Sequence, residues 1–287
     1  MNMKLPFTID LSEKVAVVTG GAGVLCGTFA SALAACGARV AVLDIDLAKA
    51  EKAAASIRAG GGMALGVGAS VLDRVSLMTA EEHVRTEFGP CDILINGAGG
   101  NHPKGTTSME TLDPEALRRG NADLVTFFDL DAEGIQFVFN LNFLGTLLPT
   151  QAFARSMVDR GGGAIVNISS MNAFKPLTKI PAYSGAKAAV SNFTQWLAVH
   201  FSRCGIRVNA MAPGFFLTEQ NRALLIRPDG TLNDRAAKIM GMTPLGRFGK
   251  PGDLIGTLLW LVDDNASGFV TGTVIPVDGG FSAYAGV

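Results

Sequence analysis

A tyrosine and a lysine four residues apart carry the clearest chemical signal in this sequence. Tyr183 and Lys187 stand in the stretch YSGAK. Residues four apart share one face of a helix, so the lysine ammonium is expected beside the tyrosine hydroxyl. A free tyrosine has a pKa of about 10, and a nearby positive charge lowers that pKa by favouring the phenolate. The pair is therefore a candidate device for proton transfer at neutral pH.

Two polar residues upstream of Tyr183 are candidates for the same site. Ser170 follows the apolar run 164–168, and Asn142 lies in the stretch NFLG. Each residue alone also has a plain structural interpretation. A tyrosine on an alanine-rich helix usually packs with its hydroxyl bonded to a nearby carbonyl, and a serine at a strand end is often a turn residue. Ser169 is an alternative to Ser170.

Apolar runs alternate with helical stretches along the whole chain. Strands are expected at 15–19, 39–43, 64–67, 92–95, 164–168, 207–211 and 273–277. Helices are expected at 27–35, 46–59, 73–88, 134–159, 181–202 and 251–262. Such alternation predicts a parallel sheet with helices on both faces and right-handed crossovers. We therefore expect one α/β domain over residues 1–287, with a doubly wound sheet.

Composition narrows the class of protein. The 287 residues are 48% hydrophobic and 17% charged, with a net charge of −1, so no electrostatic footprint for nucleic acid or an acidic membrane is evident. A mean hydropathy of +0.31 fits buried parallel strands. No apolar stretch is long enough to span a membrane, and the N-terminus is too polar for a signal peptide. The four cysteines match no zinc or disulfide pattern, which predicts reduced thiols, no metal and a cytoplasmic location.

A glycine-rich turn after the first strand points to a dinucleotide. Glycines in Gly20-Gly21-Ala22-Gly23 allow backbone N–H groups to approach a pyrophosphate at a helix N-terminus. Asp44 ends the second strand, where a carboxylate can accept hydrogen bonds from the adenosine ribose and repel a 2′-phosphate. No basic residue follows at once, so we expect NAD(H) to be preferred over NADP(H). Alternatively, Asp44 caps the turn and Asp46 binds the ribose.

Together these motifs resemble the short-chain dehydrogenase/reductase family over nearly the whole chain. The resemblance implies a seven-stranded Rossmann fold with strand order 3-2-1-4-5-6-7. It implies that Tyr183 is the acid/base, and that Lys187 lowers the pKa of Tyr183 and binds the nicotinamide ribose. Ser170 would hold the substrate oxygen, and Asn142 would help to fix a water that links Lys187 to solvent. It also implies a homotetramer, with Asp278-Gly279-Gly280 near the subunit contacts.

The glycine motifs depart from the family pattern at two places. The family's first turn reads T-G-x-x-x-G-x-G, but Val24 and Cys26 occupy the positions of the later two glycines. The family's N-N-A-G element is N-G-A-G here, with Gly97 in place of the second Asn. Ser70 falls where the family often has an Asp near adenine. The implied cofactor-binding residues are Gly20, Gly21, Gly23, Val24, Leu25, Asp44, Ser70, Asn96, Gly97, Ala98, Tyr183, Lys187, Pro213, Gly214, Phe216 and Thr218.

Two long segments carry the clues to the small-molecule substrate. They are an insertion at about 100–133 and a predicted substrate lid at about 215–250, and a connection this long is usually functional or disordered. Polar and cationic candidates gather in or near them, which suits a polyhydroxy carboxylate better than a sterol or fatty-acyl chain. The candidates are His102, Lys104, Asn172, Lys175 and Arg222, with Gln220 and Asn221 beside Arg222.

The stretches GGNHPK and FFDL within the insertion resemble the fructuronate reductase (D-mannonate oxidoreductase) branch of the family. That branch interconverts D-mannonate and D-fructuronate. Singly, these charged residues also fit a solvated loop, and His102 could simply cap a turn.

Three alternatives stay open. The same chemistry could act on a gluconate-type keto acid, a polyol or a small ketone. A non-catalytic NAD(H)-binding regulator is a second possibility, supported by the altered glycine turn and opposed by the presence of all four catalytic side chains. A ketoacyl-thioester reductase is a third, but it would be expected to carry a basic residue near the end of the second strand.

Overall fold

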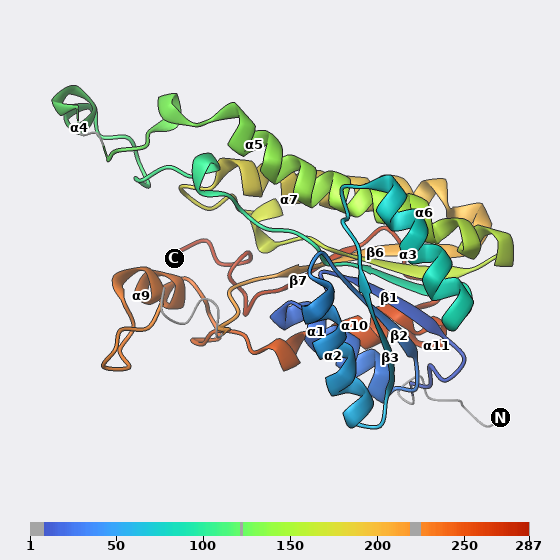
Figure 1. The fold of residues 1–287 in the computed structure, drawn as a ribbon. Helices are drawn as coiled ribbons and strands as arrows, with labels where there is room; N and C mark the ends of the chain where they lie inside the picture. The colour runs from blue at the N-terminus through green and yellow to red at the C-terminus, as the bar shows by residue number, and fades with distance from the viewer. Residues whose placement is uncertain (1–8, 121–122, 219–224, 287) are drawn as a thin grey trace.

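A seven-stranded parallel sheet forms the centre of the computed structural model, which describes residues 9–120, 123–218 and 225–286. The strand order is β3-β2-β1-β4-β5-β6-β7, as the sequence motifs imply (Figure 1). The strands are β1 (Val15–Thr19), β2 (Arg39–Asp44), β3 (Met63–Gly68), β4 (Ile93–Asn96), β5 (Gly163–Ile168), β6 (Ile206–Pro213) and β7 (Val274–Val277). Each predicted strand is therefore present within one or two residues of its predicted limits.

The central strands are apolar because both of their faces are covered. Every residue of β1, β4 and β6 is buried. On one face of the sheet a core forms with α1 (Val24–Ala35), α2 (Leu47–Ala59) and α10 (Ile255–Val262). On the other face a second core forms with α3 (Arg74–Glu87), α6 (Gly145–Arg160) and α7 (Pro181–His200). This is the doubly wound arrangement expected for a parallel sheet.

Two lobes project from the same side of this layered body (Figure 1). One is an arm that carries α4 (Pro114–Arg119) and leads into α5 (Ala132–Phe139). The other lobe carries α9 (Asp234–Gly241). The short helix α11 (Asp264–Ser267) is not part of either lobe and follows α10 in the main body. The arm falls within the predicted insertion, and the α9 lobe falls within the predicted lid.

The stretch 134–159 is not the single helix that the sequence predicts. It divides into α5, a π-helical turn at Asn140–Leu144, and α6. Asn142 lies in this turn, and its side-chain amide donates to the carbonyl of Val138 at 2.8 Å. A π-helical turn widens a helix locally, and such turns often occur at functional sites.

A buried set of side-chain hydrogen bonds ties the middle of the sheet to the helices that cover it. The Asn96 amide donates to Thr150 Oγ1 and to Asn167 Oδ1, both at 2.9 Å. The Asn167 amide donates in turn to Thr194 Oγ1 at 2.9 Å. The set joins β4 and β5 to α6 and α7, beneath the ends of the strands where a ligand would bind.

Replacing Asn96 is expected to destabilise the fold. In the Asn96→Ala variant, two buried acceptors lose their donor, so the free energy of unfolding should fall by about 1–3 kcal/mol. Urea denaturation measures this change. Asn101→Ala is the matched control, because the Asn101 amide makes an exposed bond to Thr106 and its loss should cost less than about 0.5 kcal/mol. Equal effects of the two substitutions would contradict a supporting role for Asn96.

Candidate active site

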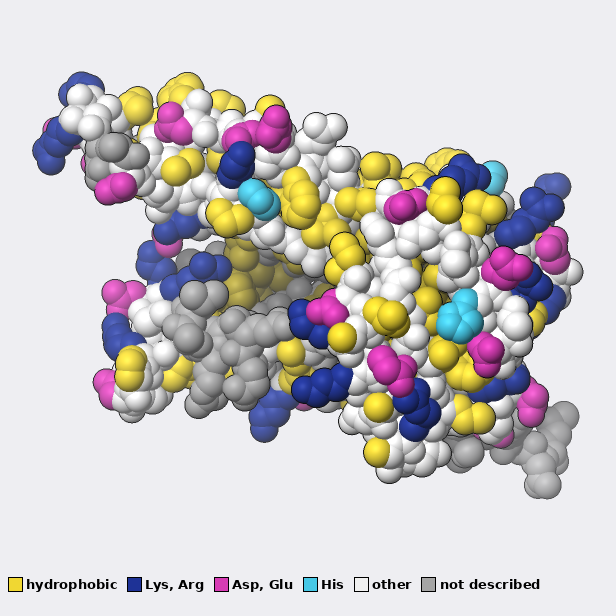
Figure 2. Space-filling view, in the orientation of Figure 1, with side chains coloured by type: hydrophobic (Ala, Val, Ile, Leu, Met, Phe, Trp, Pro, Cys, Tyr) yellow, Lys and Arg dark blue, Asp and Glu magenta, His cyan; other side chains and the backbone are white. Residues whose placement is uncertain are grey.

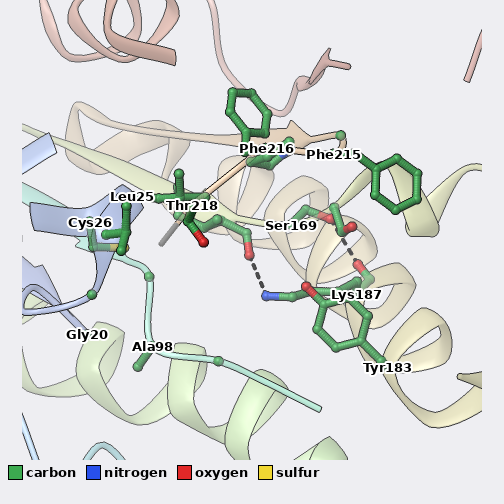
Figure 3. Close-up of a pocket in the computed structure, with 18 of the residues that line it drawn as sticks. Gly20, Leu25, Cys26, Ala98, Ser169, Tyr183, Lys187, Phe215, Phe216 and Thr218 are labelled. Atoms are coloured by element: carbon green, nitrogen blue, oxygen red, sulfur yellow. Dashed lines mark hydrogen bonds between the residues drawn. The ribbon is translucent and has the colours of Figure 1, made fainter. Parts of the chain in front are cut away.

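The carboxyl ends of five strands surround a cleft of about 520 Å³. The cleft lies where the strand order reverses between β1 and β4, which is the position at which doubly wound sheets bind ligands. Figure 3 shows Gly20, Cys26 and Ala98 on one side of it and Tyr183 and Lys187 on the other.

The turn after β1 has the backbone shape and the charge that a phosphate needs. Gly20 has φ +62°, and a Cβ atom placed on it would lie 3.0 Å from the Cα of Ala98. Within the described residues, no side chain caps the N-terminus of α1 at Gly23, and the first turn of α1 holds no acidic residue. Backbone N–H groups at such a helix start are suited to an anion. The residues present therefore fit the pyrophosphate of a dinucleotide.

Asp44 and Asp46, the two alternatives for the ribose, lie in different surroundings. Asp44 lines the cleft, and its carboxylate accepts hydrogen bonds from the backbone N–H groups of Ala22 at 3.3 Å and Asp46 at 3.2 Å. Asp46 instead caps the N-terminus of α2 and forms an ion pair with Lys49 at 3.1 Å. The geometry therefore favours Asp44 as the carboxylate that faces a ligand.

Tyr183 and Lys187 lie side by side on α7, at the end of β5 (Figure 3). The Lys187 ammonium is 5.6 Å from the centre of the Tyr183 ring and donates to the carbonyl of Ile168 at 2.8 Å. Ser169 is turned toward α7, where its hydroxyl donates to the carbonyl of Lys187 and pairs with Ser191. Ser170 forms a hydrogen bond with Tyr183. The structure thus places Ser170, rather than Ser169, against the tyrosine hydroxyl.

The pKa of Tyr183 moves in the direction opposite to the one expected from the sequence. Burial raises the pKa of the Tyr183 hydroxyl, and its hydrogen bond with Ser170 opposes that rise. The Lys187 ammonium does not reverse the change, because it lies over the ring and bonds to the Ile168 carbonyl. A neutral tyrosine is the form that can donate a proton. Burial lowers the pKa of Lys187 to about 8.

Asn142 and Gly99 shape the space around the lysine. The Asn142 amide donates to the carbonyl of Gly100 at 2.7 Å, and its oxygen accepts from the Gly100 N–H at 3.3 Å. A Cβ atom on Gly99 would lie 2.6 Å from Asn142 Oδ1 and 3.2 Å from Lys187 Nζ. Only a glycine at position 99 therefore lets the chain pass this close to both side chains.

Most of the residues predicted for the cofactor line the cleft. They are Gly20, Gly23, Val24, Leu25, Asp44, Gly97, Ala98, Tyr183, Lys187, Pro213, Gly214, Phe216 and Thr218. Three lie elsewhere: Gly21 packs against β1 and β2, Asn96 is the buried last residue of β4, and Ser70, in the turn after β3, donates its N–H to Ser76 of α3.

Four further residues line the cleft that were not predicted from the sequence: Cys26, Gly99, Ile168 and Phe215. Two of them carried a signal. Gly99 closes the N-G-A-G element, and Cys26 stands at a glycine position of the family motif.

The residues predicted for the substrate do not line this cleft in the described part of the chain. His102 caps a turn, since its Nδ1 accepts from the Lys104 N–H at 3.2 Å. Lys104 forms an ion pair with Asp131 at 3.1 Å, and Lys175 donates to the carbonyl of Tyr284. Asn172 is buried beside Ser170. Arg222, with Gln220 and Asn221, falls outside the described residues.

A dinucleotide-sized crevice at the switch point, next to a Ser-Tyr-Lys cluster, defines the chain as a Rossmann-type oxidoreductase. The profile of the family described as short chain dehydrogenase matches residues 14–226. The chain therefore belongs to the short-chain dehydrogenase family, whose members use NAD(P) to act on CH–OH groups.

Several relatives match this chain from end to end. An uncharacterized oxidoreductase of Haemophilus influenzae is 54% identical over 285 residues, which cover 99% of both chains. The Bacillus subtilis protein named Uncharacterized oxidoreductase UxuB is 52% identical, over 99% of this chain and 100% of the relative. A crystal structure from Haemophilus influenzae, provisionally described as a D-mannonate oxidoreductase with bound NAD, has a TM-score of 0.93 and 54% identity. The match covers 99% of this chain and 100% of that one.

Two features are absent from the residues that the structure describes. These residues contain no group of three or more His, Cys, Asp or Glu side chains placed to hold a metal ion. None of the helices in 9–120, 123–218 or 225–286 is long and apolar enough to cross a membrane.

The buried lysine should make stability depend on pH in a defined window. The pKa of Lys187 is about 8 in the folded protein, against 10.5 in the reference state. Between these values the unfolded chain binds more protons, so the free energy of unfolding should rise with pH relative to a Lys187→Met variant. Below about pH 8 the difference between the two proteins should be flat.

Urea denaturation of both proteins at several pH values measures this difference. The other titrating groups are common to both proteins and largely cancel. Lys52→Met, at an exposed lysine of α2, should run parallel to the parent protein throughout. A difference that stays flat up to about pH 9.5 would show that the Lys187 ammonium is not desolvated as described.

Proposed function

We propose that this protein is an NAD-dependent oxidoreductase that interconverts D-mannonate and D-fructuronate. The observation that carries the proposal is one continuous cleft, lined by Asp44 at one end and by Ser170, Tyr183 and Lys187 at the other. The likeness to the Haemophilus influenzae structure with bound NAD, over nearly the whole of both chains, supports the choice of cofactor and substrate.

In this proposal Tyr183 moves the proton. Its neutral hydroxyl donates to the carbonyl oxygen of the keto acid during reduction, and its phenolate accepts the proton from the alcohol during oxidation. Ser170 bonds both Tyr183 and the same substrate oxygen, and the Lys187 ammonium stabilises the phenolate while it exists. Asn142 holds the Gly100 backbone next to Lys187. When bound, the nicotinamide cofactor supplies or accepts the hydride.

The preference for NAD over NADP rests on charge. The Asp44 carboxylate would repel a 2′-phosphate, and Lys187 is the one cation among the described residues that line the cleft. Lys187 lies at the end of β5, where it donates to the carbonyl of Ile168, three strands away from Asp44 at the end of β2, so it does not offset that repulsion.

The two projecting lobes would enclose the sugar acid. Figure 2 shows the surface hollowed between the arm and the α9 lobe. Glu110 of the arm and Lys238 of α9 form an ion pair at 3.0 Å, which joins the lobes. We take the insertion at about 100–133 and the lid at about 215–250 as the walls of the substrate site, with His102, Lys104, Asn172, Lys175 and Arg222 as the groups to test. We also propose that the protein forms a homotetramer and is located in the cytoplasm.

A neutral polyol or small ketone is the second candidate substrate. It is favoured by a specific observation, because Lys104 and Lys175 are already bonded within the chain, to Asp131 and to the Tyr284 carbonyl. A substrate carboxylate would have to displace these partners or use another cation.

NADH oxidation against a panel of ketones tests the proposed function. The panel holds D-fructuronate, 5-keto-gluconate and neutral ketones. The proposal predicts turnover mainly with D-fructuronate, and the reverse reaction with D-mannonate and NAD. Turnover with neutral ketones alone would select the second candidate. NADH binding without turnover of any member would contradict the proposed substrate class.

Removing the Tyr183 hydroxyl should abolish the proton transfer. In Tyr183→Phe, kcat is expected to fall by about 10²–10⁴-fold, the usual contribution of a general acid/base, while the dissociation constant for NADH changes little. Tyr284→Phe is the matched control, since Tyr284 is the other tyrosine of the chain and its described hydrogen bonds, to Gly280 and from Lys175, are made by its backbone. Full activity in Tyr183→Phe would refute the role of the hydroxyl.

Removing the Asp44 carboxylate should relax the cofactor preference. The ratio of kcat/KM for NAD to that for NADP is expected to fall by about tenfold or more in Asp44→Ala, because a like-charge repulsion of about 1.4 kcal/mol is lost. Steady-state kinetics with both cofactors measures the ratio. Asp46→Ala, which removes the cap of α2 and the exposed ion pair with Lys49, should leave it unchanged. An effect in Asp46→Ala alone would transfer the ribose contact to that residue.

A further inference from the structure

Two residues that depart from the family's glycine motifs, Cys26 and Gly97, lie next to each other in the fold. Cys26 lies in the first turn of α1, and Gly97 follows β4. A Cβ atom placed on Gly97 would lie 2.2 Å from the Cys26 sulfur. Non-bonded heavy atoms rest at about 3.5–4.0 Å, so no side chain fits at position 97 while the sulfur stays in place.

This contact lies where two turns of the cleft touch. Both residues line the cleft. The N–H groups of Gly97 and Ala98 donate to Thr19 Oγ1 at 3.1 and 3.2 Å, which ties the turn after β4 to the end of β1. A Cβ atom on Gly20 would also press on the Ala98 backbone at 3.0 Å. A change in the spacing of these turns would therefore displace the backbone that faces the phosphates.

The cysteine contributes volume to this place rather than charge. Cys26 is 6% exposed, and burial raises the pKa of its thiol to about 12. The thiol is therefore neutral at physiological pH and does not repel an anion. A helix start that holds a neutral, compact group keeps its attraction for phosphate.

We propose that Cys26 and Gly97 form a matched pair that sets the spacing of the two turns and so positions the dinucleotide. This inference rests on the proposed cofactor site. Cys26 acts there as a positioning residue. Where the family pattern has a side chain at position 97 and none at 26, this chain has the reverse. Position 97 should therefore not tolerate a side chain while the Cys26 sulfur is present.

Of the Cys26 atoms, only the sulfur would clash with a Cβ atom at position 97, so the pair can be tested by substitution. A Cβ atom on Gly97 would lie 3.5 Å from the Cys26 Cβ, an ordinary contact. Removing the sulfur in Cys26→Ala should therefore make room for Gly97→Ala. The Thr19 carbonyl would remain 3.0 Å from the new Cβ, so a shift of a few tenths of an ångström, and incomplete recovery, are expected.

A double-mutant cycle on NADH binding tests the pair. The dissociation constant, read from NADH fluorescence, should rise by about tenfold or more in Gly97→Ala, since displacements of about 1 Å cost this much and more. It should change by less than about threefold in Cys26→Ala, where only a small group is lost. The double variant should regain most of the lost affinity. In Gly97→Ala the loss of kcat at saturating NADH should be smaller than the loss of NADH affinity, because the Tyr183 and Lys187 side chains are not altered.

Gly99→Ala is the control that shows whether Cys26→Ala rescues any glycine substitution in the cleft or only the one at position 97. Gly99 faces Asn142 and Lys187, so Cys26→Ala should not rescue it. If Gly97→Ala fails to fold, recovery of folding and NADH binding in the double variant still supports the pair. A double variant no better than Gly97→Ala, or a Gly97→Ala that binds NADH normally, overturns the pair alone. A parent protein that does not bind NADH overturns the cofactor site itself.

Discussion

A single buried ammonium group imposes the strictest constraint on this active site. Lys187 is 4% exposed, and the carbonyl of Ile168 accepts a hydrogen bond from it at 2.8 Å. Taking a charge out of water costs several kcal/mol unless nearby groups compensate, and here burial lowers the pKa of the lysine to about 8. The lysine is thus held at the end of β5, beside Tyr183, in a place that only a fully assembled sheet and α7 can provide.

The surrounding elements hold Lys187 in this position beside Tyr183. The π-helical turn brings Asn142 to the Gly100 backbone, and the missing side chain of Gly99 leaves room for both Asn142 and Lys187. Beneath them, Asn96 and Asn167 join β4 and β5 to the covering helices. The sheet order places the turn after β1, Asp44 and the Tyr183–Lys187 pair around one crevice. A dinucleotide site and a proton-transfer group therefore share the same walls.

The strands, their order and most of the cleft could be predicted from the sequence because they depend on local pattern. Apolar runs mark buried parallel strands, and the spacing of Tyr183 and Lys187 marks a helix face. The π-helical turn could not be predicted from local pattern, and the contact that Asn142 makes from it joins this turn to Gly100, far away in sequence. Three further features depend on distant residues and on burial, which local pattern does not contain: the close approach of Gly97 to the Cys26 sulfur, the partners of Lys104 and Lys175, and the raised pKa of Tyr183.

A crystal structure of the protein soaked with NAD and D-mannonate would test the account most directly. The account predicts a dinucleotide along the cleft, with its adenosine ribose at Asp44. It also predicts one sugar-acid hydroxyl within hydrogen-bonding distance of both Tyr183 Oη and Ser170 Oγ. A dinucleotide whose ribose lies away from Asp44, or a sugar acid bound with none of its hydroxyl groups at Tyr183, would contradict it.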